Sequence, residues 1–173
     1  KHSFVVDKSW KDKIINLVFE GSMTDTEVRI NGKLAGEIHQ GSFYVFKYDI
    51  SKLIKYGQKN LLEVKVSKHS SNASVNAAER EADYWILGGI FRPVYLEALP
   101  KTYISRLSID ARADGSYRSR ILHSGSANEI SMQVYDQQGK PFGQVVKQKV
   151  DSDSTWLNLN FSKPKLWSAE FPN

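Results

Sequence analysis

Cysteine is absent from this chain of 173 residues, which excludes disulfide bonds and thiolate metal sites. The absence does not identify a compartment, since many exported bacterial proteins also lack cysteine. No apolar run is long enough to span a bilayer, so we expect no membrane-spanning segment. No signal peptide is recognisable, and Lys1 is not a natural start. We therefore expect a processed or cut piece of a longer chain.

The sequence also lacks a concentration of charge of one sign. The net charge is +5, but acidic residues interleave with the basic ones, so a nucleic-acid partner is not expected. Hydrophobic residues make up 40% of the chain and aromatic residues 12%, which is enough to build a core and argues against disorder. The length is sufficient for one large or two small domains.

Apolar residues recur at every second position in several segments, which predicts strands with one buried face and one wet face. These segments are 15–19, 28–30, 62–66, 130–134 and 157–161. Asn31-Gly32 predicts a hairpin turn, because both central residues of a type I′ turn need positive φ. Weaker signals of the same kind stand at Asp114-Gly115 and Gln138-Gly139. Frequent short strands joined by turns favour an all-β fold of antiparallel sandwiches.

Two further segments bear on the organisation of the chain. The only helical candidate is short: Asp49 or Ser51 is placed to cap a turn through Leu53 and Ile54, which Gly57 ends. Residues 67–83 are polar and are expected to form a long loop without strands, and such loops are usually functional or mobile.

A domain boundary is expected at Pro100. Proline cannot donate to a β-ladder, and a new alternating run begins at Tyr103, so we expect domains at 1–99 and 100–173.

The candidate chemistry lies in an acidic, aromatic stretch. Glu79, Glu81 and Asp83 alternate with other residues, and Tyr84 and Trp85 follow directly. One interpretation is a solvated acidic loop with an arginine partner. The other is that Asp83 accepts hydrogen bonds from a sugar hydroxyl or helps to hold a cation, with an aromatic ring beside it. No pair of carboxylates suited to glycoside cleavage is identifiable, so no catalytic residue is predicted.

The remaining candidates carry no recognisable site pattern. The four histidines lack the spacing of zinc ligands, so no metal-binding residue is predicted: His2, His39, His69 and His123. Four aromatic residues crowd one likely strand, and core packing is the expectation for them: Phe43, Tyr44, Phe46 and Tyr48.

Several motifs occur in a fixed order along the first hundred residues. They are LVFEG at 17–21, TEVRINGK at 26–33, HQGSF at 39–43, FKYDI at 46–50, NLLEVKV at 60–66, and DYW at 83–85 running into GIFR at 89–92. Together they resemble glycoside hydrolase family 2, which includes β-galactosidases, β-glucuronidases and β-mannosidases. The resemblance implies a sugar-binding jelly-roll domain over 1–99, without its first strands. It also implies an immunoglobulin-like sandwich over 100–173, without its last strands; LWS at 166–168 and PN at 172–173 resemble that domain's closing segment.

The resemblance implies a noncatalytic part of a β-glycosidase. The family's catalytic acid and nucleophile are glutamates of a TIM-barrel domain that follows the immunoglobulin-like domain. Asp83 matches a residue that reaches the barrel and contacts the sugar, in some members with a bound cation. Trp85 is the second substrate-binding candidate, although packing is the role expected for it first. Arg92 matches a recurrent residue with a structural role, in which an arginine fork holds a loop.

The partners and location follow from the same resemblance. They are a β-glycoside bound through the parent enzyme, the TIM barrel of the same chain, and a second copy where open sheet edges pair. No cofactor is expected in this chain, whereas the resemblance allows a monovalent or divalent cation in the parent. The bacterial periplasm or the extracellular space is favoured, with the cytoplasm as the alternative.

Two other functions stay open at this point. The chain could be a self-standing carbohydrate-binding module that uses exposed aromatic rings, for which Tyr84, Trp85 and Trp156 are the candidates. It could also be a structural interaction domain without a ligand.

Overall fold

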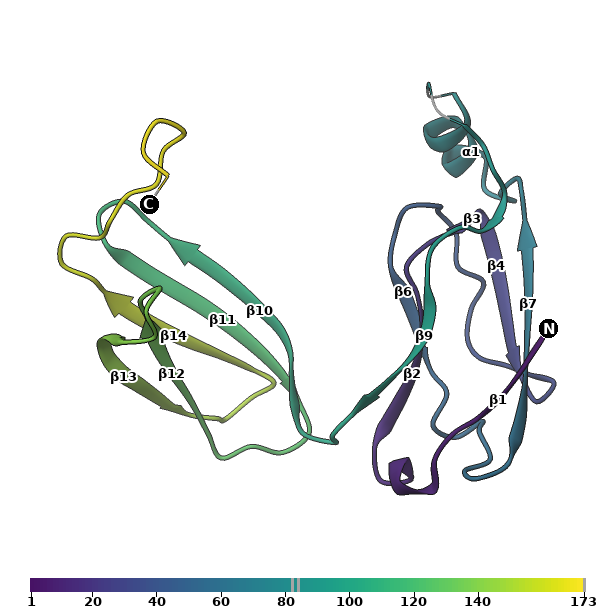
Figure 1. The fold of residues 1–173 in the computed structure, drawn as a ribbon, viewed down its shortest axis with the longest axis horizontal. Helices are drawn as coiled ribbons and strands as arrows, with labels where there is room; N and C mark the ends of the chain where they lie inside the picture. The colour runs from purple at the N-terminus through teal and green to yellow at the C-terminus, as the bar shows by residue number, and fades with distance from the viewer. Residues whose placement is uncertain (82, 84, 173) are drawn as a thin grey trace. The chain divides into compact units, whose positions relative to one another are not determined.

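The computed structural model describes residues 1–81, 83 and 85–172. The chain divides into two compact units, unit 1 over Lys1–Pro100 and unit 2 over Lys101–Asn173 (Figure 1). Each is built from antiparallel strands, which confirms the all-β prediction. Within the described residues no helix has the length and the apolar character that crossing a membrane would need.

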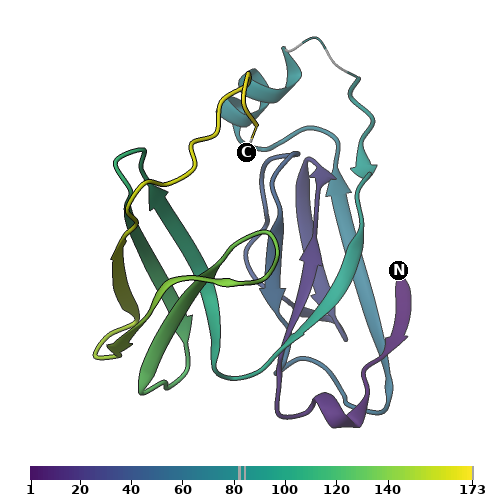
Figure 2. The ribbon, with the colours of Figure 1, turned by 60° about the vertical axis from the view of Figure 1, so that its left-hand side comes forward.

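Unit 1 is a sandwich of two main sheets with a short strand pair at one end. One sheet has the order β1-β7-β4-β5, the second has the order β6-β2-β9, and β3 pairs with β8. The strands are β1 (His2–Val5), β2 (Ile14–Phe19), β3 (Ser22–Met23), β4 (Asp25–Ile30), β5 (Lys33–Leu34), β6 (Phe46–Asp49), β7 (Lys59–Ser67), β8 (Gly89–Ile90) and β9 (Val94–Leu99). A 3-10 turn, η1 (Lys8–Trp10), and one helix, α1 (Ala73–Arg80), lie at opposite ends of the sandwich (Figures 1 and 2).

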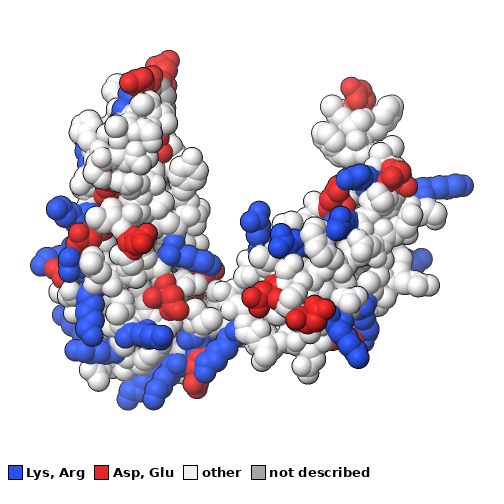
Figure 3. All heavy atoms as spheres, turned by 180° about the vertical axis from the view of Figure 1, so that it is seen from behind, with Lys and Arg blue, Asp and Glu red and all other residues white. Residues whose placement is uncertain are grey.

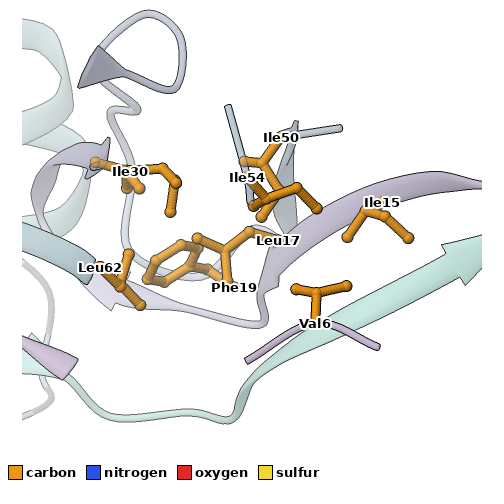
Figure 4. Packing of buried hydrophobic residues seen from close by; sticks show 9 residues of the cluster. Val6, Ile15, Leu17, Phe19, Ile30, Ile50, Ile54 and Leu62 are labelled. Carbon is orange, nitrogen blue, oxygen red and sulfur yellow. The ribbon is translucent and has the colours of Figure 1, made fainter. Parts of the chain in front are cut away.

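The core of unit 1 lies between the two main sheets. Side chains from both sheets and from the connecting turns meet there (Figure 4): Val6, Ile15, Leu17, Phe19, Val28, Ile30, Ile50, Ile54 and Leu62. The alternation in β4 and β7 predicts their buried and exposed faces correctly. In β2 the prediction of a wet face is wrong, because Asn16 and Val18 are also buried. β2 is the middle strand of its sheet, and the Asn16 amide is satisfied by the Glu97 carboxylate at 2.9 Å.

The predicted hairpin at Asn31-Gly32 is confirmed. Asn31 has φ +52° and Gly32 has φ +83°, and the turn joins Ile30 of β4 to Lys33 of β5. The Asn31 amide also donates to the Leu53 carbonyl oxygen at 2.9 Å, which ties the turn to another part of the unit.

The capped turn predicted between Asp49 and Gly57 is present, and it does not extend into a helix. Asp49 does cap the segment, since its carboxylate accepts from the Ser51 amide at 2.9 Å. Only a turn follows, in which the amides of Leu53 and Ile54 both donate to the Ile50 carbonyl oxygen. Nucleating a helix costs more free energy than one turn recovers. A segment of this length therefore forms a turn that does not continue as a helix.

An apolar groove of about 460 Å³ opens along unit 1 between β1 and β9, which are both edge strands. Core residues such as Leu17, Phe19 and Leu62 line its floor. Its lining has few polar groups, so it does not suit a sugar.

Unit 2 has a three-stranded sheet, β10-β11-β14, and a two-stranded hairpin, β12-β13. Its strands are β10 (Tyr103–Ala111), β11 (Ser116–Ser124), β12 (Glu129–Tyr135), β13 (Pro141–Lys149) and β14 (Ser154–Asn160). Ile121, Ile130 and Leu157 form a small core between the two layers. Both predicted turns are present, with Gly115 at φ +89° and Gly139 at φ +78°.

The core of unit 1 makes a stability prediction. Phe19 is fully buried and its ring stacks on that of Phe46 at 4.9 Å. We expect Phe19→Ala to lower the free energy of unfolding by about 3–5 kcal/mol, because the cavity left behind cannot close fully. The matched control is Leu34→Ala, whose side chain is 50% exposed, with an expected change within about 0.5 kcal/mol. Urea denaturation followed by circular dichroism measures both, and equal losses would contradict this assignment of the core.

Candidate functional site

The candidate residues Asp83 and Trp85 lie in the loop that leaves α1 and returns to the sandwich at β8. Both side chains are exposed, and Trp85 is 88% exposed. The expectation that Trp85 packs is therefore wrong. Tyr84 lies outside the described residues. The loop exposes a carboxylate and an indole ring, which suits the binding of a ligand more than packing within unit 1.

The loop returns to the sandwich through a pair of glycines. Gly88 has φ +80° and Gly89 has φ +79°, which are conformations that other residues adopt only with strain. The Gly88 amide lies 3.5 Å from the sulfur of Met23, and Gly89 pairs with Met23 between β8 and β3. The glycines thus turn the chain sharply into the sheet, and the end of the loop is fixed there.

Helix α1 supports the other end of the loop, and sequence reasoning missed it. The expectation for residues 67–83 was a loop without strands; Ser67 is the last residue of β7, and the described residues after it, 68–81 and 83, form no strand. Asn72 begins the helix, because its side chain accepts from the Ser74 amide at 3.0 Å. The alanines that follow favour a helix. The signal is weak because α1 has eight residues and none of them is buried, so no apolar stripe marks it.

Glu79 joins α1 to the segment before β6. Its carboxylate accepts from the Ser42 amide at 3.0 Å and from the Ser42 hydroxyl at 2.7 Å. Ser42 is fully buried, whereas Glu79 is half-buried. The idea of a solvated acidic loop is therefore wrong for Glu79. Hydrogen bonds to an ionised group are stronger than neutral ones, so this contact holds the helix close to the sandwich.

A second carboxylate holds the start of α1. Asp25 of β4 is buried, and its Oδ2 accepts from the Ser71 amide at 2.8 Å and the Ser71 hydroxyl at 2.9 Å. The Gln40 amide donates to the same oxygen at 3.2 Å and to the Ser71 hydroxyl at 2.9 Å. Both ends of the helix are thus fixed to the sandwich through hydrogen bonds to carboxylates.

Arg80 closes the network from the last residue of α1. Its Nη2 donates to the hydroxyl of Thr24, which is fully buried. The hydroxyls of Ser22 and Thr26 share a further hydrogen bond beside it. Among the described residues, Nε and Nη1 of Arg80 and Oδ1 of Asp25 are buried without a hydrogen-bond partner. The bonds that do form favour one position for the helix.

The electrostatics of the network favour ionised Asp25 and neutral His39. Burial raises the pKa of Asp25, but hydrogen bonds from Ser70, Ser71 and Gln40 outweigh it and leave that pKa below its ordinary value. Burial lowers the pKa of His39, against the opposing effects of the Gly41 carbonyl and of nearby carboxylates. The His39 ring stacks on Phe46 at 3.7 Å.

A shallow hollow of about 450 Å³ lies between α1 and the segment before β6. Phe43 and Tyr44 line it and are 42% and 65% exposed, so the expectation that they pack in the core is wrong. Phe46 and Tyr48 do pack against the core, as expected. The hollow combines aromatic rings with the polar side chains of Gln40, Ser74 and Glu79. Such a set suits sugars, since ring faces and hydroxyl groups need both kinds of contact.

Charge is unevenly distributed over unit 1. Figure 3 shows acidic side chains at the tip that carries α1, and lysine and arginine side chains gathered at the opposite tip.

Within the described part of the chain, no group of three or more histidine, aspartate or glutamate residues is placed to hold a metal ion.

Arg92 precedes β9 and is exposed. It donates from Nη1 to the Glu20 carbonyl oxygen at 3.4 Å, and its guanidinium carbon lies 5.4 Å from the Phe91 ring centroid. The hydrogen bond to Glu20 links the residues before β9 to the end of β2, through one donor of the guanidinium group.

The sequence profile described as "Glycosyl hydrolases family 2, sugar binding domain" matches residues 1–100. The chain therefore belongs to glycoside hydrolase family 2. It is 30% identical over 181 residues to a protein of Formosa agariphila named provisionally as a β-glucuronidase, and 29% identical over 181 residues to a β-galactosidase of Thermoanaerobacter pseudethanolicus. These alignments include 100% and 99% of this chain but 21% and 24% of the two relatives. The chain thus spans less than a quarter of their length.

Solved structures share the fold over both units. A β-glucuronidase of Bacteroides uniformis superposes with a TM-score of 0.80 at 20% identity, covering 98% of this chain and 22% of that one. A β-glucuronidase of Bifidobacterium dentium gives 0.79 at 20% identity, covering 98% of this chain and 34% of that one. These likenesses confirm the predicted architecture, a jelly-roll sandwich followed by an immunoglobulin-like sandwich.

The carboxylate network predicts a dependence of stability on pH. Because the folded pKa of Asp25 is depressed, its contribution is complete above the ordinary aspartate pKa of about 3.9. It is lost as the pH falls through the folded pKa. We expect Asp25→Asn to lower the free energy of unfolding by about 1.5–3 kcal/mol at pH 7, the range for hydrogen bonds to a charged group.

Between pH 5 and pH 2, the wild-type protein should then lose more stability than the Asp25→Asn variant. Urea denaturation at several pH values measures this difference. Parallel pH profiles would show that Asp25 does not carry the effect.

Proposed function

We propose that this chain is a noncatalytic, sugar-binding part of a family 2 glycoside hydrolase that cleaves β-galactosides or β-glucuronides. The observation that supports the proposal most is the exposed Asp83, which stands in a loop whose two ends are fixed by α1 and by β8. A carboxylate held in this way can accept hydrogen bonds from two neighbouring sugar hydroxyls. The names of the relatives supply the two sugar classes.

In this proposal, the catalytic glutamates belong to a TIM-barrel domain of the same protein. Asp83 contacts the sugar at the rim of the barrel's active site, and Trp85 covers an adjacent surface of the sugar or of the barrel. The indole is 88% exposed in unit 1, so its ring face is open to contact with a sugar or another domain. A cation beside Asp83 would have to find its other ligands in the barrel or on the substrate.

The role of Asp83 is testable in the full-length parent enzyme. We expect Asp83→Asn to lower kcat/KM tenfold or more, which corresponds to about 1.4 kcal/mol of transition-state binding. The amide keeps the size of the side chain but loses the charge and one acceptor. Steady-state kinetics with aryl β-galactoside and aryl β-glucuronide measure the effect.

The matched control is Glu81→Gln, which removes a charge from an exposed neighbour in the same loop. It should leave kcat/KM within about twofold, a change of less than 0.5 kcal/mol. Unchanged kinetics for a folded Asp83→Asn enzyme would show that the loop is scaffold only.

The chain by itself should bind sugars weakly, because half of the proposed site lies in the barrel. We expect no hydrolysis of aryl glycosides and a Kd weaker than about 1 mM for galactose, glucuronic acid and mannose, or about 4 kcal/mol of binding free energy at most. Isothermal titration calorimetry with the three sugars measures this. Micromolar binding to any of them would favour the alternative, a self-standing carbohydrate-binding module that uses the hollow beside Tyr44.

A further inference from the structure

The outer face of the three-stranded sheet in unit 2 carries an arginine-rich surface that the proposed function does not use. β11 is the middle strand, between β10 and β14 (Figure 1). Arg118 and Arg120 are exposed, whereas Ser119 and Ile121 between and beside them are buried. The two arginines therefore point away from the core of unit 2, on the same side of the sheet.

The neighbouring strands add to this side. Residues directly opposite each other in an antiparallel pair share a face. Arg120 is opposite Trp156 and Arg118 is opposite Asn158 on β14; on β10, Ser108 is opposite Arg120 and Asp110 is opposite Arg118. We call this set the Arg–Trp face: Ser108, Asp110, Arg118, Arg120, Trp156 and Asn158.

The tryptophan holds both guanidinium groups in place. The guanidinium carbon of Arg118 lies 3.9 Å from the Trp156 ring centroid, and that of Arg120 lies 5.8 Å from it. The indole remains 44% exposed. Stacking on a ring restricts an arginine but leaves its N–H donors, which lie in the guanidinium plane, able to bind a ligand.

The charge of these arginines is only partly compensated, since Asp110, opposite Arg118, attracts it without forming an ion pair. Among the residues that the structure describes, neither Arg118 nor Arg120 forms an ion pair. Arg120 donates from Nε to the Ser154 hydroxyl at 3.1 Å, which orients it without neutralising it. Asp110 is paired with Arg112 at 2.9 Å. The Arg–Trp face thus holds two preoriented cations with spare donors.

We propose that the Arg–Trp face binds an anionic polysaccharide, with Arg118 and Arg120 receiving its carboxylate or sulfate groups. Arg118 and Arg120 are two residues apart on one strand, so their backbone positions are about 6.8 Å from each other. Each arginine can therefore bind a separate anionic group of an extended polysaccharide. Guanidinium groups bind carboxylates and sulfates through paired hydrogen bonds. Asp110 and Asn158 supply acceptors for sugar hydroxyls on the same face.

A nucleic acid fits this face less well. The exposed ring on this face, Trp156, is already stacked against Arg118. Single strands are usually held by several free aromatic platforms. The proposal concerns unit 2 and is independent of the role of Asp83 in unit 1, so either can fail alone.

Affinity electrophoresis and isothermal titration calorimetry test the proposal on the purified chain. The probes are polygalacturonate for carboxylates, dextran sulfate for sulfates, neutral dextran, and a DNA oligonucleotide. We expect binding to at least one of the two anionic polysaccharides and none to dextran. Arg118→Ala/Arg120→Ala should weaken that binding tenfold or more, and the preferred polymer identifies the anionic group.

Lys147→Ala/Lys149→Ala on β13 is the matched control, because it removes the same charge from the same unit, and it should change affinity less than threefold. Arg118→Lys/Arg120→Lys keeps the charge but removes the planar guanidinium groups, so its loss of affinity should lie between those of the control and of the alanine variant. This variant provides the test if the alanine variant does not fold. Equal losses in the arginine-to-alanine and control variants, no binding to either anionic polymer, or tighter binding to DNA would overturn the proposal.

Discussion

Two carboxylates that accept hydrogen bonds at one end of unit 1 determine where its candidate residues lie. Asp25 holds Ser71 just before α1, and Glu79 holds Ser42 from the last turn of the helix. Helix α1 buries none of its residues, so apolar packing cannot position it. An isolated helix of this length is unstable in water, which makes the charged hydrogen bonds its main support. The loop with Asp83 and Trp85 depends on that support.

The sandwich behind this network explains how such polar contacts can be buried. The two sheets close over an apolar core, and the hydroxyls of Ser22, Thr24 and Thr26 are fully buried at its end. There Arg80 and Ser42 reach them from outside the sheets. Binding residues often lie on loops that a rigid scaffold positions, and the sandwich is such a scaffold for this loop. Membership of glycoside hydrolase family 2 agrees with this arrangement.

Sequence reasoning succeeded where one periodicity dominates and failed where two effects compete. The alternation in β4, β7, β12 and β14 and the turn at Asn31-Gly32 are all local signals, and the structure confirms them. The wet face predicted for β2 failed because long side chains of the neighbouring strands flank it: Asp49 and Glu97 lie beside Asn16, and Lys47 and Tyr95 lie beside Val18. Alternation within one strand does not reveal such neighbours. Helix α1 was missed because its stability comes from Asp25, a residue about fifty positions earlier. Phe43 and Tyr44 were assigned to the core because their strand appeared longer than β6 is.

The sequence by itself determined the all-β class, the hairpin turns, the family resemblance and the choice of Asp83 and Trp85 as candidates, because these depend on residue types at short spacings. Only the tertiary structure decided which of these side chains are exposed, which carboxylates hold α1, and that Arg118 and Arg120 meet on Trp156. Each of those facts joins residues from different strands or helices. The physical reason is that pairing register and burial arise from contacts between segments distant in sequence, and no local pattern encodes them.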